Sequence, residues 1–169
     1  TPAERFHVLP PGISRDRIPT ENTSEQRHVM RTALGFQPDD QLILIIASRF
    51  KTKGVDRALH AVASLPASDR KSIQVLIVGD DKPGIYARLA KRLGIATQVH
   101  FYGARDDVPA FLLAADLLLH PAYREAAGMV LLEALVAGLP VLVTGNCGYA
   151  TYIDAANAAS TLVCKNTSS

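Results

Sequence analysis

Short, continuous apolar runs alternate along the chain with segments whose apolar residues recur at helical spacing. Runs that are apolar throughout are typical of strands buried on both faces. The predicted strands are 42–47, 73–79, 99–103, 116–120, 140–144 and 160–164. The predicted helices are 24–34, 55–65, 86–93, 108–115, 130–137 and 149–154. This alternation implies right-handed βαβ units, and therefore a Rossmann-like, doubly wound α/β fold with a parallel sheet of about six strands.

In such a sheet, ligands bind outside the carboxyl ends of the strands. The polar, glycine-containing segments that follow the predicted strands are therefore the candidate site. These segments are 48–54, 79–84, 103–107, 120–128 and 144–148.

Composition narrows the class of protein. The 169 residues are about one domain, and a hydrophobic content of 48% suffices for a substantial core. The formal net charge of +2 is too small to indicate nucleic acid but suits an anionic small molecule. Cys147 and Cys164 fit a reducing compartment and suggest neither a metal site nor a disulfide framework. No apolar run reaches the length of roughly 18 residues that spans a bilayer.

Two glutamates, Glu125 and Glu133, stand eight positions apart around a helix start. Eight residues of helix measure about 12 Å, so the two carboxylates cannot share one metal ion or one proton. They could instead bind the two ends of a long ligand, with its phosphates at the first N–H groups of the helix near Gly128. A nucleotide-sugar has that shape. The alternative is that the two glutamates recur on a helix face by chance.

Three cations, Arg49, Lys51 and Lys53, follow the first predicted strand and could neutralise a diphosphate. The glycine spacing is not that of a P-loop, and the alternative is a solvated basic loop. After another strand, Gly103 would let backbone approach a base or ribose, and Arg105 is a second-rank contact to phosphate or sugar. His120, at the end of an apolar strand, is more typical of a satisfied structural residue than of a base.

With these residues in place, the chain resembles the C-terminal, nucleotide-sugar-binding domain of a retaining GT-B glycosyltransferase of family 4. The pair Glu125 and Glu133, with Gly128 between them, matches that family's signature, and the resemblance covers nearly all of the chain. Shorter strings look like the lipopolysaccharide core glucosyltransferase I group, the UDP-glucose:heptose α-1,3-glucosyltransferases of Gram-negative bacteria. These strings lie at 79–83, 117–123, 125–128 and 147–150.

The resemblance implies a role for each matching residue. Glu133 would bind the ribose hydroxyls and Glu125 the hydroxyls of the donor sugar. The backbone of Gly128, Met129 and Val130 would receive the diphosphate, and Lys53 and Arg49 would neutralise the charge that builds as UDP leaves. Arg105 would assist near the nucleotide, with Arg17 a weaker candidate near the phosphates. Arg49 and Lys53 are four positions apart where the family usually has five, so Lys51 is an alternative for the role of Arg49.

The implied reaction is retaining transfer of glucose from UDP-glucose to a heptose of the lipopolysaccharide core, with no metal or other cofactor. The implied protein is cytoplasmic, and its full-length form could contact the inner membrane surface. Because the chain starts at Thr1 and ends in a short polar tail, we expect an excised donor domain that covers residues 1–169. The acceptor-binding N-terminal domain and the last helices would then be absent. Three alternatives stay open: another nucleotide-sugar donor and acceptor, a GT-B nucleotide-sugar epimerase, and a non-catalytic Rossmann-like module.

Overall fold

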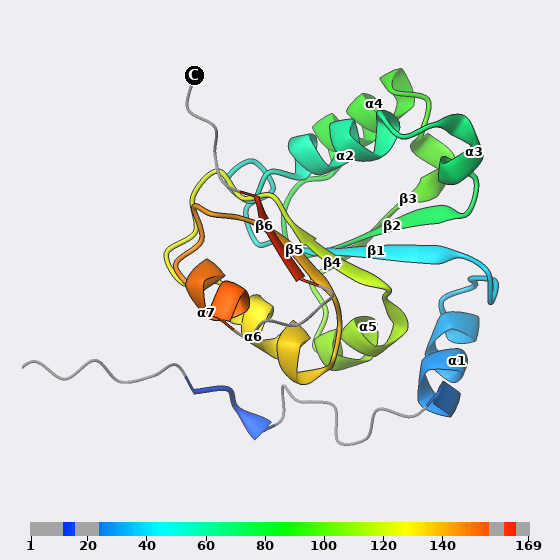
Figure 1. Cartoon of the computed structure of the whole chain (residues 1–169). Coiled ribbons are helices and arrows are strands. Elements are labelled where there is room, and N and C mark those ends of the chain that lie inside the picture. Colours follow the sequence, from blue (N-terminus) through cyan, green and yellow to red (C-terminus); the bar gives the residue numbers. More distant parts are fainter. Residues whose placement is uncertain (1–11, 16–23, 156–160, 165–169) are drawn as a thin grey trace, which may run out of the picture.

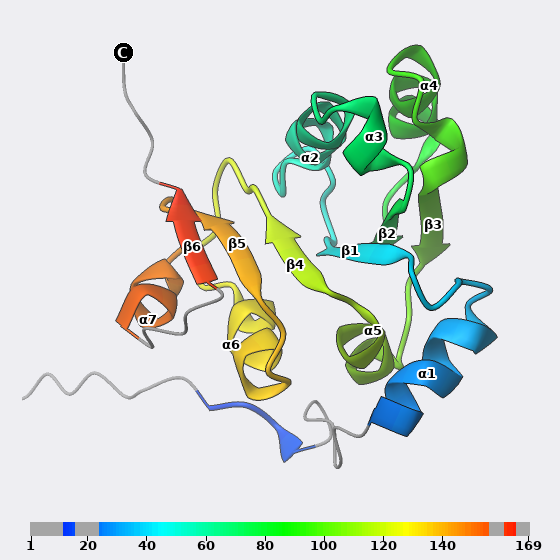
Figure 2. The ribbon, with the colours of Figure 1, turned by 45° about the vertical axis from the view of Figure 1, so that its right-hand side comes forward.

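The computed structural model describes residues 12–15, 24–155 and 161–164, and it describes 154–155 and 161–164 at the level of the backbone. Its centre is a single sheet of six parallel strands in the order β3-β2-β1-β4-β5-β6 (Figure 2). The strands are β1 (Gln41–Ile46), β2 (Ile73–Val78), β3 (Val99–Gly103), β4 (Leu117–His120), β5 (Val141–Thr144) and β6 (Thr161–Cys164). The predicted parallel sheet of about six strands is confirmed.

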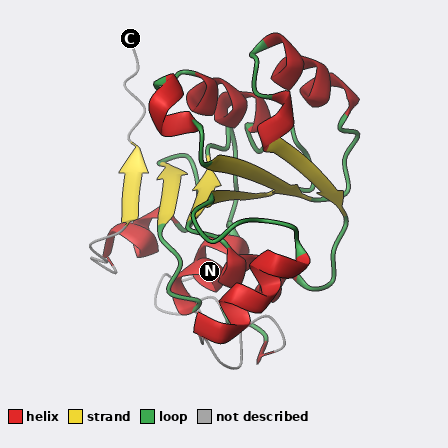
Figure 3. Cartoon of the chain, turned by 90° about the vertical axis from the view of Figure 1, so that its right-hand side faces the viewer, coloured by secondary structure: helices red, strands yellow, loops and turns green. Residues whose placement is uncertain are grey.

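Helices cover both faces of this sheet (Figures 1 and 3). They are α1 (Ser24–Ala33), α2 (Val55–Ala63), α3 (Ala67–Arg70), α4 (Gly84–Arg92), η3 (Ala96–Gln98), α5 (Val108–Ala114), α6 (Met129–Val136) and α7 (Ala150–Ala155). Figure 1 shows α2, α3 and α4 on one face and α1, α5, α6 and α7 on the other. The sequence did not predict α3 and η3, because segments of four and three residues are too short to show a helical period.

Alternate residues of the central strands build two separate cores. Leu42 and Leu44 of β1 lie in the cluster beneath α5 and α6, whereas Ile45 packs against α2 on the opposite face. All three side chains are at most 1% exposed, so each contributes roughly 1.5–3 kcal/mol through burial. This burial on both faces explains why the strands are apolar throughout rather than alternating.

The strand order reverses between β1 and β4, which pair directly in parallel. Chains leaving these two strands turn to opposite faces, so a crevice opens at their carboxyl ends. The two loops approach closely there: a Cβ on Gly54, whose φ is 72°, would lie 2.1 Å from the carbonyl oxygen of Pro121. The N–H of Tyr123 also donates to the carbonyl of Thr52 at 2.9 Å. The fold therefore brings the basic loop and the Glu125 segment together.

Candidate functional site

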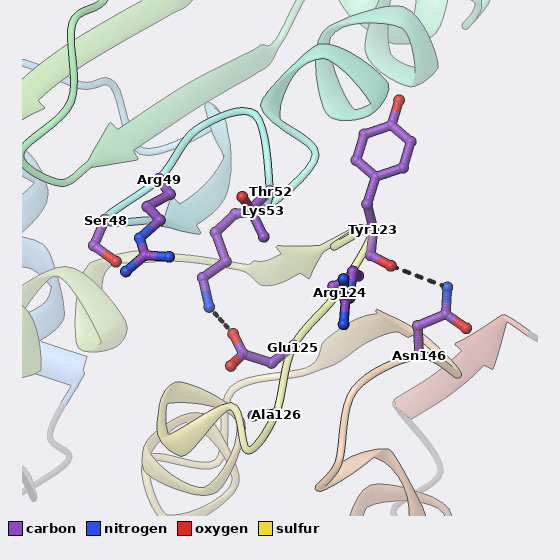
Figure 4. Close-up of a pocket in the computed structure, with 9 residues that line it drawn as sticks. All are labelled: Ser48, Arg49, Thr52, Lys53, Tyr123, Arg124, Glu125, Ala126 and Asn146. Carbon is purple, nitrogen blue, oxygen red and sulfur yellow. Dashed lines mark hydrogen bonds and ion pairs between the residues drawn. The ribbon is translucent and has the colours of Figure 1, made fainter.

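A cleft of about 960 Å³ lies at the carboxyl ends of β1 and β4 (Figure 4). Its lining comes from the loop after β1, the loop after β4 and the turn after β5. The lining residues are Ser48, Arg49, Thr52, Lys53, Tyr123, Arg124, Glu125, Ala126 and Asn146. Three of the predicted site residues, Arg49, Lys53 and Glu125, are thus together in one cleft.

Lys53 and Glu125 form an ion pair across the floor of this cleft, with Lys53 Nζ donating to Glu125 Oε2 (Figure 4). Their side chains are only 18% and 12% exposed, so water screens this pair less than it screens a surface pair. Burial lowers the pKa of Lys53, and the nearby Arg49 guanidinium lowers it further.

The backbone of Glu125 is fixed by the turn after β5. Glu125 forms a parallel β-bridge with Cys147, and its carbonyl accepts a hydrogen bond of 3.1 Å from the N–H of Gly148. A Cβ on Gly148 would lie 2.0 Å from the carbonyl oxygen of Ala126, so only glycine fits this contact. The Glu125 carboxylate is therefore presented from a supported backbone rather than from a free loop.

The basic loop after β1 is also ordered by hydrogen bonds. Its turn closes through the N–H of Lys53, which donates to the carbonyl of Arg49 at 2.9 Å. The N–H of Phe50 donates to Asp81 Oδ2 at 2.8 Å, and this bond is the main cause of the lowered pKa of Asp81. The loop after β2 thus contributes a carboxylate that orients the cations without lying in the cleft.

Two further guanidinium groups, of Arg49 and Arg124, belong to exposed residues of the cleft lining and make no ion pair with any residue in the described part of the chain. Arg49 and Lys53 extend in the same direction in Figure 4. The sequence analysis missed Arg124, although its place directly before Glu125 in a loop at a strand end was a usable signal. Lys51, the alternative to Arg49, is exposed and does not line the cleft.

Helix α6 begins beside the cleft, at the predicted anion site. Gly128 occupies the N-cap position with a φ of 89°, which glycine adopts without strain, and Met129 is the first helical residue. The first N–H groups of an α-helix have no helical acceptors and carry partial positive charge. The backbone of Gly128, Met129 and Val130 therefore forms a helix start at the end of the Glu125 segment, as predicted from the sequence.

Glu133 lies one turn into α6 and is only 4% exposed. It takes part in interactions with other groups of the chain and is absent from the cleft lining. A carboxylate in such a buried place is rare without a specific reason, so Glu133 is not an ordinary solvated residue of a helix face. The predicted contact of Glu133 with ribose remains a prediction.

Two further predicted residues, Gly103 and Arg105, do not line the cleft. Gly103 ends β3 at the edge of the sheet with a φ of 68°, and open space surrounds it. Arg105 is held by Asp107 through hydrogen bonds of 2.8 and 2.7 Å, so it is not a free cation. Asp107 occupies the N-cap position of α5, but its side chain binds Arg105 instead of capping the helix. Arg17 falls outside the described residues.

His120 ends β4 directly beneath Glu125 and is 1% exposed. Its Nε2 lies 3.4 Å from Glu125 Oε2, yet neither ring nitrogen has a hydrogen-bond partner among the described residues. Burial, followed by the charge of Lys53, lowers the pKa of His120 to about 4, so the imidazole is neutral at pH 7. The ring nitrogens of His120 are therefore not satisfied by hydrogen bonds in the described part of the chain, and a structural rather than a basic role for the residue remains a prediction.

Other classes of site find no support in the described part of the chain. Its His, Cys, Asp and Glu side chains include no group of three that could hold a metal ion. Burial raises the pKa of the Cys147 thiol, which argues against a reactive thiolate. None of the described helices has the length and apolar character needed to cross a membrane.

A family model described as glycosyl transferases group 1 matches residues 26–169. The chain belongs to this family. Within it, the chain is 51% identical over 157 residues to the lipopolysaccharide glucosyltransferase WaaG of Escherichia coli (strain K12). This alignment covers 93% of the chain and 42% of that relative.

Solved structures agree with the fold. The crystal structure of WaaG, a glycosyltransferase involved in lipopolysaccharide biosynthesis, superposes with a TM-score of 0.92 and 48% identity over 100% of the chain and 45% of that structure. Anabaena HepE in complex with UDP-glucose matches with a TM-score of 0.69 and 25% identity, over 76% of the chain and 36% of that structure. The predicted half of a GT-B fold is confirmed, and the chain spans less than half the length of these relatives.

Proposed function

We propose that this chain is the donor-binding domain of a retaining glycosyltransferase that transfers glucose from UDP-glucose to a heptose of the lipopolysaccharide core. The observation that carries the proposal is the Lys53–Glu125 ion pair in a cationic cleft, next to the start of α6. A diphosphate needs cations and N–H donors, while a sugar needs a fixed carboxylate to accept from its hydroxyls. The 51% identity to a lipopolysaccharide glucosyltransferase favours glucose and this acceptor.

The donor phosphates would lie between the cations and the first turn of α6. Lys53 and Arg49 would neutralise the negative charge that builds on the diphosphate as UDP leaves, and the N–H groups near Gly128, Met129 and Val130 would add to this stabilisation. Such groups act strongly because they are already oriented before the reaction begins. Arg124, which faces the same cleft without an ion-pair partner among the described residues, is a third cation for this role.

Glu125 would hold hydroxyls of the donor sugar rather than attack its anomeric carbon. Its Oε2 is bound by Lys53, and its Oε1 has one long contact of 3.4 Å with the N–H of Ala127. Oε1 is therefore the oxygen that remains available to accept hydrogen bonds from a sugar. Glu133 would bind ribose, and Gly103 would lie near the base. Arg105 would assist there after exchanging its partner Asp107 for the nucleotide.

The acceptor would bind mainly through an N-terminal domain outside this chain, and a lipid-linked acceptor would bring the whole enzyme to the cytoplasmic face of the inner membrane. We therefore expect this chain to bind donor and not to form product. An assay with UDP-glucose and a heptose acceptor tests this expectation, because product above background would contradict it. A changed hexose without acceptor would instead indicate an epimerase.

Calorimetric titration with UDP-glucose tests the proposed donor site directly. Lys53→Ala removes the cation of the ion pair, whereas the matched control Lys51→Ala removes an exposed lysine of the same loop that does not line the cleft. A charge-assisted bond contributes about 1.5–3 kcal/mol, so Lys53→Ala should weaken binding by about tenfold or more and Lys51→Ala by less than about twofold. Equal effects of the two changes, or no binding by the folded parent chain, would contradict the proposal.

A further inference from the structure

His120 is the most unusual buried side chain near the cleft. It ends β4, a central strand of the sheet, at the place where the strand order reverses. Its imidazole is 1% exposed, and both ring nitrogens are fully covered without a hydrogen-bond partner in the described part of the chain. A buried polar group without a partner costs about 1–3 kcal/mol, and such groups are rare enough in native proteins to call for an explanation.

The ring approaches the carboxylate of Glu125. Nε2 lies 3.4 Å from Oε2, the same oxygen that accepts from Lys53 Nζ. The backbone on both sides is fixed, since His120 pairs in register with Val143 of β5 and Glu125 is bridged to Cys147. A small rotation of either side chain would complete a hydrogen bond without moving the sheet.

We infer that His120 is a positioning residue for Glu125, whose carboxylate it holds from below through an Nε2–H donor to Oε2. A neutral imidazole can donate this bond without adding a second positive charge beside Lys53. Glu125 would then keep its place when the Lys53 ammonium turns toward the donor phosphate. Oε1 would remain directed at the sugar.

This inference rests on the proposed function, in which Glu125 contacts the sugar and the cations contact the diphosphate. It predicts that losing the imidazole impairs recognition of the glucosyl group and not of UDP. The informative quantity is the ratio of the Kd for UDP to the Kd for UDP-glucose in one and the same variant. If His120 had only a structural role, its substitution would lower the stability of the chain, or would weaken the binding of UDP and of UDP-glucose equally.

The matched substitutions are His120→Gln and His120→Met. The two new side chains have nearly the same shape, but only the amide can donate a hydrogen bond from a position close to that of Nε2. By calorimetry, His120→Met should lower the ratio by about tenfold, which is the worth of one hydrogen bond to a charged group, and His120→Gln should keep it within about threefold. An unchanged ratio in a folded His120→Met variant, or an equal loss in both variants, would overturn the inference.

A second measurement needs no ligand and separates this inference from the proposed function. Two-bond proton–nitrogen NMR spectra of the imidazole report which ring nitrogen carries the proton. The inference requires the tautomer protonated at Nε2 in the parent chain and a shift of the Nε2 resonance in Glu125→Gln. A tautomer protonated at Nδ1 would overturn it even if UDP-glucose binds as proposed. If the parent chain instead binds UDP-glucose no more tightly than UDP, the proposed contact of Glu125 with the sugar is wrong. In that case the tautomer of His120 alone shows whether its imidazole supports the Glu125 carboxylate.

Discussion

Lys53 and Glu125 stand 72 positions apart in the chain and meet in the cleft as an ion pair. Each was predicted as a site residue because it follows a strand, but their direct contact was not predicted. The strand order explains this contact, because β1 and β4 are neighbours in the sheet although β2 and β3 lie between them in the sequence. The pair matters chemically because it holds the carboxylate in place before any ligand binds.

The buried imidazole of His120 makes the stability of the chain depend on pH. Its folded-state pKa of about 4 lies below the ordinary value of 6.5, so between these values the unfolded state binds a proton that the folded state does not. The contribution of the neutral imidazole to the free energy of unfolding is therefore present in full above pH 6.5, and it is lost as the pH falls toward 4. Between pH 7 and pH 5, the contribution of His120 to the free energy of unfolding should fall by about 2 kcal/mol.

Urea denaturation at the two pH values measures this effect. His120→Gln, which cannot titrate, should lose about 2 kcal/mol less than the parent chain over the same interval. His60→Gln serves as the control, because it removes an exposed imidazole that does not line the cleft. Parallel losses in the parent chain and in His120→Gln would show that His120 is not held neutral by burial.

The residues of the cleft were easier to predict from the sequence than the contacts that these and neighbouring residues make. Lys53, Arg49 and Glu125 could be predicted because charge after a buried strand has few structural uses. The bond between Arg105 and Asp107, the burial of Glu133 and the missing partners of His120 could not be predicted. These features depend on side-chain rotamers and on which helix covers which strand, and periodicity carries no information about either.

At the scale of elements, the cleft depends on close contact between the loops after β1 and β4. Gly54 permits this contact, since its φ is 72° and a Cβ there would lie 2.1 Å from the Pro121 oxygen. Gly94, at the end of α4, has nearly the same φ of 71° but open space around its Cβ position. The two glycines therefore separate the cost of backbone strain from the cost of pushing the loops apart.

Substitution of each glycine by alanine tests the loop contact. Gly94→Ala should lower the free energy of unfolding by about 1–2 kcal/mol, from the left-handed conformation alone. Gly54→Ala should cost about 1–3 kcal/mol more, from the forced displacement of Pro121. Urea denaturation of both variants measures the difference, and equal costs would mean that the two loops are farther apart than described.

The order and type of these elements were predictable because the strands are continuous apolar runs and the longer helices have apolar residues at helical spacing. Every predicted strand and helix is present, with boundaries that differ by at most two residues. The sequence did not predict the two short helices, α3 and η3, which have too few residues to express a period. Contacts such as that between Gly148 and Ala126 depend on the packing of separate loops, and no local sequence pattern predicts them.

At the scale of the whole molecule, the chain is a group 1 glycosyltransferase domain with the Rossmann-like fold of half a GT-B enzyme. In the proposed function, cationic side chains and the start of α6 neutralise the charge of the diphosphate. Binding of UDP should therefore not require a divalent cation. The Kd for UDP should agree within about twofold in buffers with a chelator and with added magnesium. A dependence of tenfold or more would contradict the metal-free account.

The central claim is that the phosphates of a uridine nucleotide bind at the carboxyl ends of β1 and β4. The most direct measurement is a titration of the ¹⁵N-labelled chain with UDP, with ADP as the control, monitored by amide chemical shifts. The account predicts saturable shifts that are largest at 48–54 and 123–130, weaker with ADP and greatly reduced in Lys53→Ala. Shifts centred elsewhere, such as the basic outer face of α4 around Arg88 and Arg92, or no shifts in the folded chain, would contradict it.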